Sequence, residues 1–270
     1  MKNYVKNLAA IGFLALFLPY TITLLLDGRQ GIHQEHDWPE LEYRVMERMT
    51  QEDFSWMDDD LLELMAVICR TGCAAEPEGQ IEKRDYAYTS AESGYERLLQ
   101  AVQETRGRAV RIDGEYRELP YHAVSAGSTR SGSLLGEGYG YLVPVECPED
   151  LEAQSYLQVC TLTQRELEEA LGCAAPPEGF EMERDAQGYV TWVKNGESEW
   201  AGESFRTLLH LNSSCFWIEE VEGGLQITVK GSGHGFGVSL YTASRMFQEG
   251  ASMEDILEKF YQNAECITIP

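Results

Sequence analysis

The sequence predicts an α+β fold in which helices and antiparallel hairpins are mixed in one body, preceded by an N-terminal transmembrane helix. Three observations lead to this prediction. Segments with the apolar spacing of helices alternate with short runs of strand-like alternation. Three turn dipeptides that favour hairpins separate such runs, and the first apolar run is long enough to cross a membrane. Helices placed between hairpins favour α+β over an open parallel sheet.

The N-terminal apolar run extends from Leu8 to Leu26, nineteen residues without a charge. Lys2 and Lys6 precede it, so the N-terminus is expected in the cytoplasm and the rest of the chain outside. A cleaved signal peptide is the alternative, but the segment Thr23 to Leu26 lacks the small residues of a cleavage site. The sequence therefore favours a single-pass protein of the cell membrane.

This interpretation divides the chain into three parts. Residues 1–26 form a cytoplasmic tail and the membrane anchor, 27–37 a polar linker, and 38–270 one extracytoplasmic domain. His33 and His36 lie in the linker, where histidines are usually solvated rather than bound to metal.

Helical periodicity and end signals mark several segments of the domain. The predicted helices cover residues 41–49, 58–73, 94–105, 163–171, 203–210 and 240–248. In the second of these, Asp58 to Asp60 fill the first turn, where carboxylates are favourable. Ser252 and Asp255 form a capping box that opens the last helix.

Three hairpins are predicted from turn dipeptides between alternating runs. They pair 108–112 with 116–123 through Asp113-Gly114, 189–194 with 197–201 through Asn195-Gly196, and 215–221 with 225–229 through Gly223-Gly224.

The amino-acid composition limits the classes of molecule that the protein can bind. The net charge is -24, from 45 acidic and 21 basic residues, and the basic residues form no cluster. Such a surface repels nucleic acid and anionic lipid headgroups, so partners should be neutral, cationic or only locally matched. The seven cysteines include no C-x-x-C pair, and Cys69 and Cys73 are expected to be small buried residues of a helix.

A glycine-rich loop, Lys230 to Ser239, places His234 among alternating glycines between a strand-like and a helix-like run. A nucleotide cradle is one interpretation, but the third glycine of G-x-G-x-x-G is missing. An esterase oxyanion loop, with Ser125 as nucleophile, is a second, but the two segments stand in the wrong order. A tight turn with a structural histidine is the third, and the spacing alone favours it.

Six segments, taken in chain order, resemble one known family. They are Ala66-Val-Ile-Cys-Arg70-Thr71, Ala101-Val-Gln-Glu-Thr-Arg-Gly107, Tyr121-His122-Ala-Val-Ser125-Ala-Gly127-Ser-Thr129, Tyr139-Gly-Tyr141-Leu142, Gly202-Glu-Ser-Phe205-Arg206 and Gly233-His-Gly-Phe-Gly-Val-Ser239. They are similar to the "EALKAQAVAART", "AV..T.G", "YHASSGGRT", "PYL", "G.EFR" and "GHGVGMSQYGA" segments of the stage II sporulation protein D family of peptidoglycan lytic transglycosylases and amidase enhancers. Together they cover about residues 55 to 265.

The resemblance implies cleavage of glycan strands between N-acetylmuramic acid and N-acetylglucosamine without added water. One carboxylic acid serves as acid and base while the muramyl 6-hydroxyl closes onto C1 to give a 1,6-anhydro end. The family's residue is a glutamate, and counting back from Arg70 places Asp60 at that position. Glu63 could substitute only in a different register.

The resemblance also suggests substrate contacts. Arg70 could clamp a carboxylate or pair within the fold, His122 matches a family histidine, and His234 could contact sugar or organise its loop. Ser125, Thr129 and Ser239 could contact sugars or cap their own loops. Some members bind zinc near the matching histidine, but here Ser128 and Ser133 stand at the other ligand positions, so neither a metal nor another cofactor is expected. Leu240 replaces a family glutamine.

The sequence thus predicts a membrane-anchored lytic transglycosylase that acts on peptidoglycan glycan strands in the wall remodelling of sporulation and engulfment. The alternative is a noncatalytic glycan-binding enhancer of a cell-wall amidase. An esterase using Ser125 is a third possibility.

Overall fold

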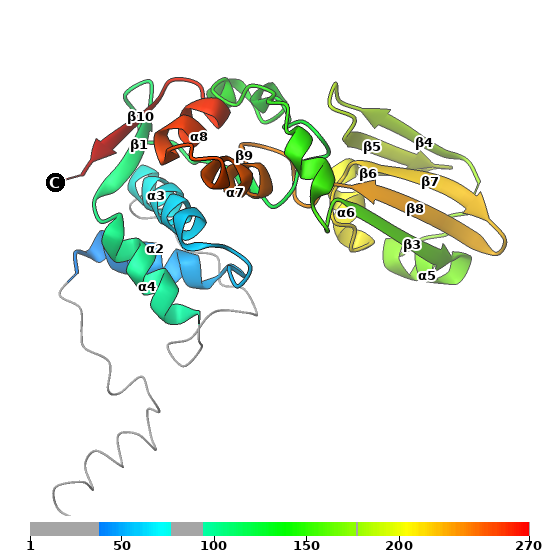
Figure 1. Cartoon of the computed structure of the whole chain (residues 1–270). Coiled ribbons are helices and arrows are strands. Elements are labelled where there is room, and N and C mark those ends of the chain that lie inside the picture. The colour runs from blue at the N-terminus through cyan, green and yellow to red at the C-terminus, as the bar shows by residue number, and fades with distance from the viewer. Residues whose placement is uncertain (1–37, 77–93, 177, 270) are drawn as a thin grey trace, which may run out of the picture. The chain divides into compact units, whose positions relative to one another are not determined.

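The structure, a computed structural model, describes residues 38–76, 94–176 and 178–269. The chain divides into two compact units between Arg106 and Gly107 (Figure 1). The predicted anchor Leu8 to Leu26 and the linker histidines lie outside the described residues. Across the three described ranges, no helix combines the length and the apolar character needed to cross a membrane.

In the described residues of the first unit, three helices pack together: α2 (Glu40–Thr50), α3 (Asp59–Ala75) and α4 (Tyr95–Glu104). The α3 helix is the central element, and most of its residues from Leu61 to Cys73 are buried. Asp58 caps its N-terminus by accepting a hydrogen bond from the Leu61 N–H at 3.0 Å. All three helices confirm the predicted segments within two residues.

The second unit begins with two short pairings. Strand β1 (Arg108–Ile112) pairs antiparallel with β10 (Ala264–Thr268), and β2 (Tyr121–His122) pairs parallel with β9 (Val238–Ser239). Between them the chain forms the 3-10 turns η2 (Gly132–Leu134), η3 (Glu137–Tyr139) and η4 (Pro148–Glu152).

The rest of the unit holds two antiparallel three-stranded sheets (Figure 1). One has the order β3-β8-β7, from Leu157–Thr163, Gly224–Lys230 and Phe216–Val221. The other has the order β4-β5-β6, from Phe180–Arg184, Val190–Asn195 and Ser198–Ala201. One hydrophobic core joins both sheets to α5 (Gln164–Leu171) and α6 (Gly202–Leu208).

Two further helices, α7 (Leu240–Gln248) and α8 (Met253–Phe260), follow the glycine-rich loop. The α8 helix opens with the predicted capping box of Ser252 and Asp255. The mixture of helices and mainly antiparallel sheets confirms the α+β class. The transmembrane helix stays a prediction.

The first predicted hairpin is wrong. Its turn forms, since Asp113 and Gly114 both have positive φ angles and Ile112 bridges to Glu115, but β1 takes β10 as its partner. The segment after Glu115 bonds elsewhere, because the Pro120 carbonyl accepts from the Val238 N–H and the Tyr261 hydroxyl. The other two hairpins are confirmed as β5-β6 and β7-β8. Strands β3, β4 and β10 were not predicted.

Candidate functional site

The candidate acid lies in the first unit, among three consecutive aspartates at the start of α3. The Asp58 side chain caps the helix, and Asp59 forms an exposed ion pair with Arg97 at 2.8 Å. Asp60 is exposed and has neither a hydrogen bond nor an ion pair within the described part of the chain. Of the three carboxylates, Asp60 is therefore the one left available to an outside molecule.

Arg70, on the same helix, has a role inside the fold. Its side chain is fully buried, and its Nη2 lies 2.8 Å from Glu42 Oε2 of α2. The guanidinium also donates to Thr105 Oγ1 and to the Val102 carbonyl at the end of α4. This burial argues against a substrate clamp and supports the alternative that Arg70 pairs within the fold, where it ties three helices together.

In the second unit, the glycine-rich loop approaches two other segments closely. A Cβ on Gly235, whose φ is +80°, would lie 2.6 Å from the Tyr189 ring. A Cβ on Gly237, whose φ is +68°, would clash with the Pro120 carbonyl oxygen. The glycines thus let the loop pack against neighbouring backbone and rings, as the tight-turn interpretation predicts.

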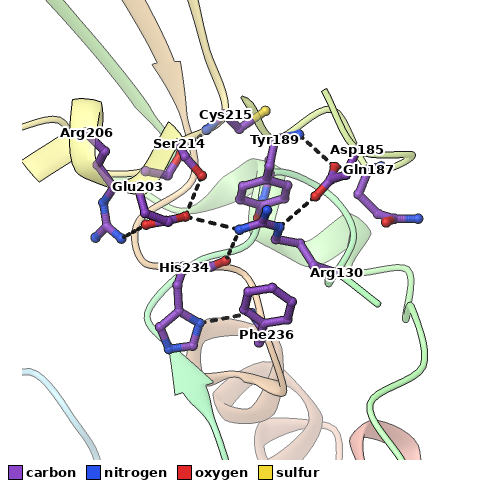
Figure 2. Close-up of polar contacts among 12 residues, drawn as sticks. Arg130, Asp185, Gln187, Tyr189, Glu203, Arg206, Ser214, Cys215, His234 and Phe236 are labelled. Atoms are coloured by element: carbon purple, nitrogen blue, oxygen red, sulfur yellow. Dashed lines mark hydrogen bonds and ion pairs between the residues drawn. The ribbon is translucent and has the colours of Figure 1, made fainter. Parts of the chain in front are cut away.

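This packing brings His122 of β2 beside His234 of the loop. The ring centroids lie 6.0 Å apart. The His122 Nδ1 lies 3.1 Å from the Phe236 carbonyl oxygen, which can only accept, so this nitrogen is the donor. His234 Nδ1 in turn accepts from the Phe236 N–H at 3.1 Å (Figure 2). Both rings are therefore held in defined tautomers by one residue.

The second nitrogen of His122 is unusual. Its Nε2 is buried and has no hydrogen-bond partner within the described residues. Burial is the main cause that lowers the pKa of His122 to about 3, with His234 adding to the effect. Burial likewise lowers the pKa of His234 to about 4, although Glu203 acts in the opposite direction. Both imidazoles are neutral at pH 7, and each can exchange hydrogen bonds with hydroxyl groups.

Arg130 links the glycine-rich loop to two other segments of the second unit (Figure 2). Its Nε pairs with the buried Asp185 carboxylate at 2.7 Å, and its Nη1 lies 3.1 Å from Glu203 Oε1 and 3.2 Å from the His234 carbonyl oxygen. The guanidinium also lies 4.8 Å from the Tyr189 ring centroid and 4.6 Å from that of Phe236. One buried cation therefore joins the β4-β5 connection, α6 and the glycine-rich loop.

Glu203 forms the partly open side of this cluster. Its carboxylate accepts from Arg206 Nη1 at 2.9 Å and from Ser214 Oγ at 2.6 Å, in addition to Arg130. The Glu203 side chain remains 43% exposed and that of Arg206 25% exposed. A fixed carboxylate and a guanidinium beside neutral imidazoles can bind the hydroxyl and amide groups of an uncharged sugar.

Two curated proteins align with most of the chain. It is 28% identical over 182 residues to "Stage II sporulation protein D" of Bacillus subtilis (strain 168), and the alignment covers 66% of this chain and 53% of that protein. It is 29% identical over 174 residues to the protein of the same name in Bacillus amyloliquefaciens, with 63% and 50% covered. Both comparisons support the resemblance to the stage II sporulation protein D family. The chain spans about half the length of these relatives, and no family model matches it.

The structure brings together three of the segments that resemble this family. His122 comes from the third segment, Glu203 and Arg206 from the fifth, and His234 from the sixth. Asp60 precedes the first segment and lies in the other unit.

Burial argues against the sugar contacts predicted for three hydroxyl side chains. Ser125 and Ser239 are fully buried and Thr129 is 1% exposed. The Ser125 N–H and the Ser239 hydroxyl both donate to the buried Asp150 carboxylate, and Thr129 Oγ1 accepts from the Val145 N–H. These side chains hold loops together, as the capping alternative predicts, and burial also argues against an esterase with Ser125 as nucleophile.

The two serines at the positions of the family's zinc ligands form local hydrogen bonds. Ser128 donates to the Thr129 carbonyl and Ser133 exchanges a hydrogen bond with Ser131. Within the described ranges, no three His, Cys, Asp or Glu residues gather closely enough to bind a metal.

The sequence alone did not predict the roles of five residues, Arg130, Asp185, Tyr189, Glu203 and Arg206. For three of them, position gave a usable signal: Arg130 directly follows the family-like segment that ends at Thr129, and Glu203 and Arg206 lie inside another such segment. Asp185 and Tyr189 come from the β4-β5 connection, where the sequence holds no comparable signal.

Proposed function

We propose that this chain is a membrane-anchored lytic transglycosylase that cleaves the MurNAc-GlcNAc linkages of peptidoglycan during sporulation, with wall remodelling in engulfment as its setting. Similarity to two proteins named stage II sporulation protein D supports the sporulation setting. The exposed Asp60 at the start of α3, whose side chain has no partner among the described residues, is the observation that carries the enzymatic proposal.

In this mechanism the Asp60 carboxyl group protonates the glycosidic oxygen as the bond from C1 breaks. It then accepts the proton of the muramyl 6-hydroxyl as that oxygen bonds to C1. The products are a 1,6-anhydromuramyl end and a free 4-hydroxyl on the leaving sugar, and no water is consumed. A single residue can perform both proton transfers because it ends each cycle in its starting protonation state.

The polar cluster of the second unit supports glycan binding. His122, Glu203, Arg206 and His234 present hydrogen-bonding groups, which suit the hydroxyl and amide groups of a sugar chain. The buried His122 Nε2 gains a donor if a sugar hydroxyl reaches it.

The test is digestion of peptide-stripped glycan strands by the purified full chain, with products identified by mass. We expect 1,6-anhydromuramyl ends, and their loss in Asp60→Asn. Asp59→Asn is the matched control, because Asp59 is an exposed neighbour that pairs with Arg97. Equal activity of Asp60→Asn and the wild type would disprove the assignment.

A second candidate is a noncatalytic glycan-binding enhancer of a cell-wall amidase. The shorter side chain of Asp60, in place of the family's glutamate, favours it, because the carboxylate retreats by roughly 1 to 1.5 Å. This function predicts glycan binding and amidase stimulation without any anhydro product, and the same stimulation by Asp60→Asn.

A further inference from the structure

The outer face of the β3-β8-β7 sheet carries an exposed apolar patch. On β3, Leu157 lies opposite Lys230 of β8, and Val159 lies opposite Thr228, which is in turn opposite Trp217 of β7. Residues opposite one another share a face, and this face is turned away from the core formed by the alternate residues. Leu157, Val159 and Trp217 are 54%, 53% and 38% exposed.

Two cations flank the tryptophan. Arg184, from the end of β4, places its guanidinium carbon 4.8 Å from the Trp217 ring centroid, and the Lys230 ammonium lies 4.9 Å from it. Arg184 donates to the carbonyls of Gly188 and Phe216, which fixes its position. Neither cation forms an ion pair with a carboxylate in the described part of the chain.

This arrangement stands out in a chain with 45 acidic and only 21 basic residues. Most of the surface repels anions, whereas two cations without carboxylate partners border an apolar strip here. The acidic Glu219 lies farther along the same face, opposite Gln226, and so marks the end of the positive region. The charge is therefore complementary to a small ligand that carries a carboxylate beside apolar groups.

We propose that the Trp217 patch, formed by Leu157, Val159, Arg184, Trp217 and Lys230, binds the carboxylate-bearing stem peptides of peptidoglycan. This inference rests on the proposed function, which makes the wall the ligand, and adds a peptide-binding site to it. The stem carboxylate contacts Lys230 and Arg184, and its small apolar side chains lie on Trp217 and Val159. The patch shares no residue with the polar cluster of His122, Glu203, Arg206 and His234, and it binds a different part of the wall.

The test compares two immobilised forms of the same glycan strands by surface plasmon resonance, one with stem peptides and one after an amidase has removed them. We expect the full chain to bind the peptide-bearing form about tenfold more tightly. Trp217→Ala and Lys230→Gln should each remove most of this difference and leave binding to stripped strands unchanged. Higher salt should reduce the difference for the wild type and much less for Lys230→Gln.

Lys259→Gln is the matched charge control, since its ammonium lies 5.8 Å from the Phe260 ring on α8, outside the patch. Thermal unfolding of each variant verifies that it folds. Equal affinity of the wild type for the two forms overturns the proposal, as does a difference that survives both substitutions. Failure of the proposed function would instead appear on stripped strands, as absent binding and absent anhydro products.

Discussion

At the scale of single residues, adjacent side chains of the same type have different roles. Asp58 caps α3 and Asp59 pairs with Arg97, whereas Asp60 is exposed and its side chain has no partner in the part of the chain that the structure describes. The three are equivalent in a sequence pattern, which only indicates that acidic residues suit a first turn. The three side chains differ in the direction in which they point and in the residues near them, and both depend on how the helix packs.

The length of the Asp60 side chain gives a direct prediction. Asp60→Glu should raise the rate of anhydro-end release by about tenfold or more, because an acid about 1 Å out of place loses much of its efficiency. Initial rates on stripped glycan strands measure it. A lower rate in Asp60→Glu would contradict the proposed geometry.

The two buried imidazoles give a prediction for pH. Their folded pKa values, about 3 for His122 and about 4 for His234, lie below the value of about 6.5 for an unfolded histidine. Between these limits the unfolded chain binds more protons, so their contribution to stability is present above about pH 6.5 and is lost as pH falls.

The urea midpoint of the wild type should therefore fall between about pH 7 and about pH 5, and that of His234→Gln should fall less. Carboxylates titrate in both proteins, so the difference between the two curves of urea midpoint against pH reports the contribution of His234. Parallel curves would contradict burial of the His234 ring.

At the scale of elements, local signals predicted most helices and two hairpins, but strand partners needed the whole fold. The Asp113-Gly114 turn forms as its dipeptide indicates, yet β1 pairs with β10, more than 150 residues away. Pairing at that distance depends on chain closure and packing rather than on a local pattern. Convergence of His122, Glu203 and His234 is unpredictable from spacing for the same reason.

The glycine-rich loop can be tested at a single position. Gly237→Ala should lower the free energy of unfolding by about 2 kcal/mol or more, because its Cβ clashes with the Pro120 carbonyl as well as straining a positive φ. Gly250→Ala is the control, since Gly250 has a φ of +90° but open space around it, so only the strain remains. Urea unfolding measures both, and equal losses would argue against the close approach of β9 to Pro120.

Arg130 links three elements through one buried charge. Arg130→Met should destabilise the second unit by about 3 kcal/mol or more, because it leaves the buried Asp185 carboxylate without its cation. The double substitution Arg130→Met with Asp185→Leu should recover part of the loss. Denaturant unfolding of the single and double variants tests this, and additive losses would contradict the coupling.

At the scale of the whole molecule, the chain combines a strongly acidic body with an N-terminal apolar run. The run predicts that the full chain stays with membranes after an alkaline carbonate wash, while a chain lacking residues 8–26 is released. Fractionation of cells expressing each form measures this. Release of the full chain by the wash would argue against an integral anchor.

The sequence by itself determined the α+β class, the bounds of most helices, the acidic surface and, through six segments in order, the resemblance to one family. These properties depend on local periodicity, composition or resemblance, each readable along the chain. Only the tertiary structure decided that Arg70, Ser125, Thr129 and Ser239 are buried supports, and that Arg130 and Glu203 join the two histidines. Burial and side-chain contacts depend on segments that are far apart in sequence. The packing of these segments decides which polar groups remain accessible to a ligand.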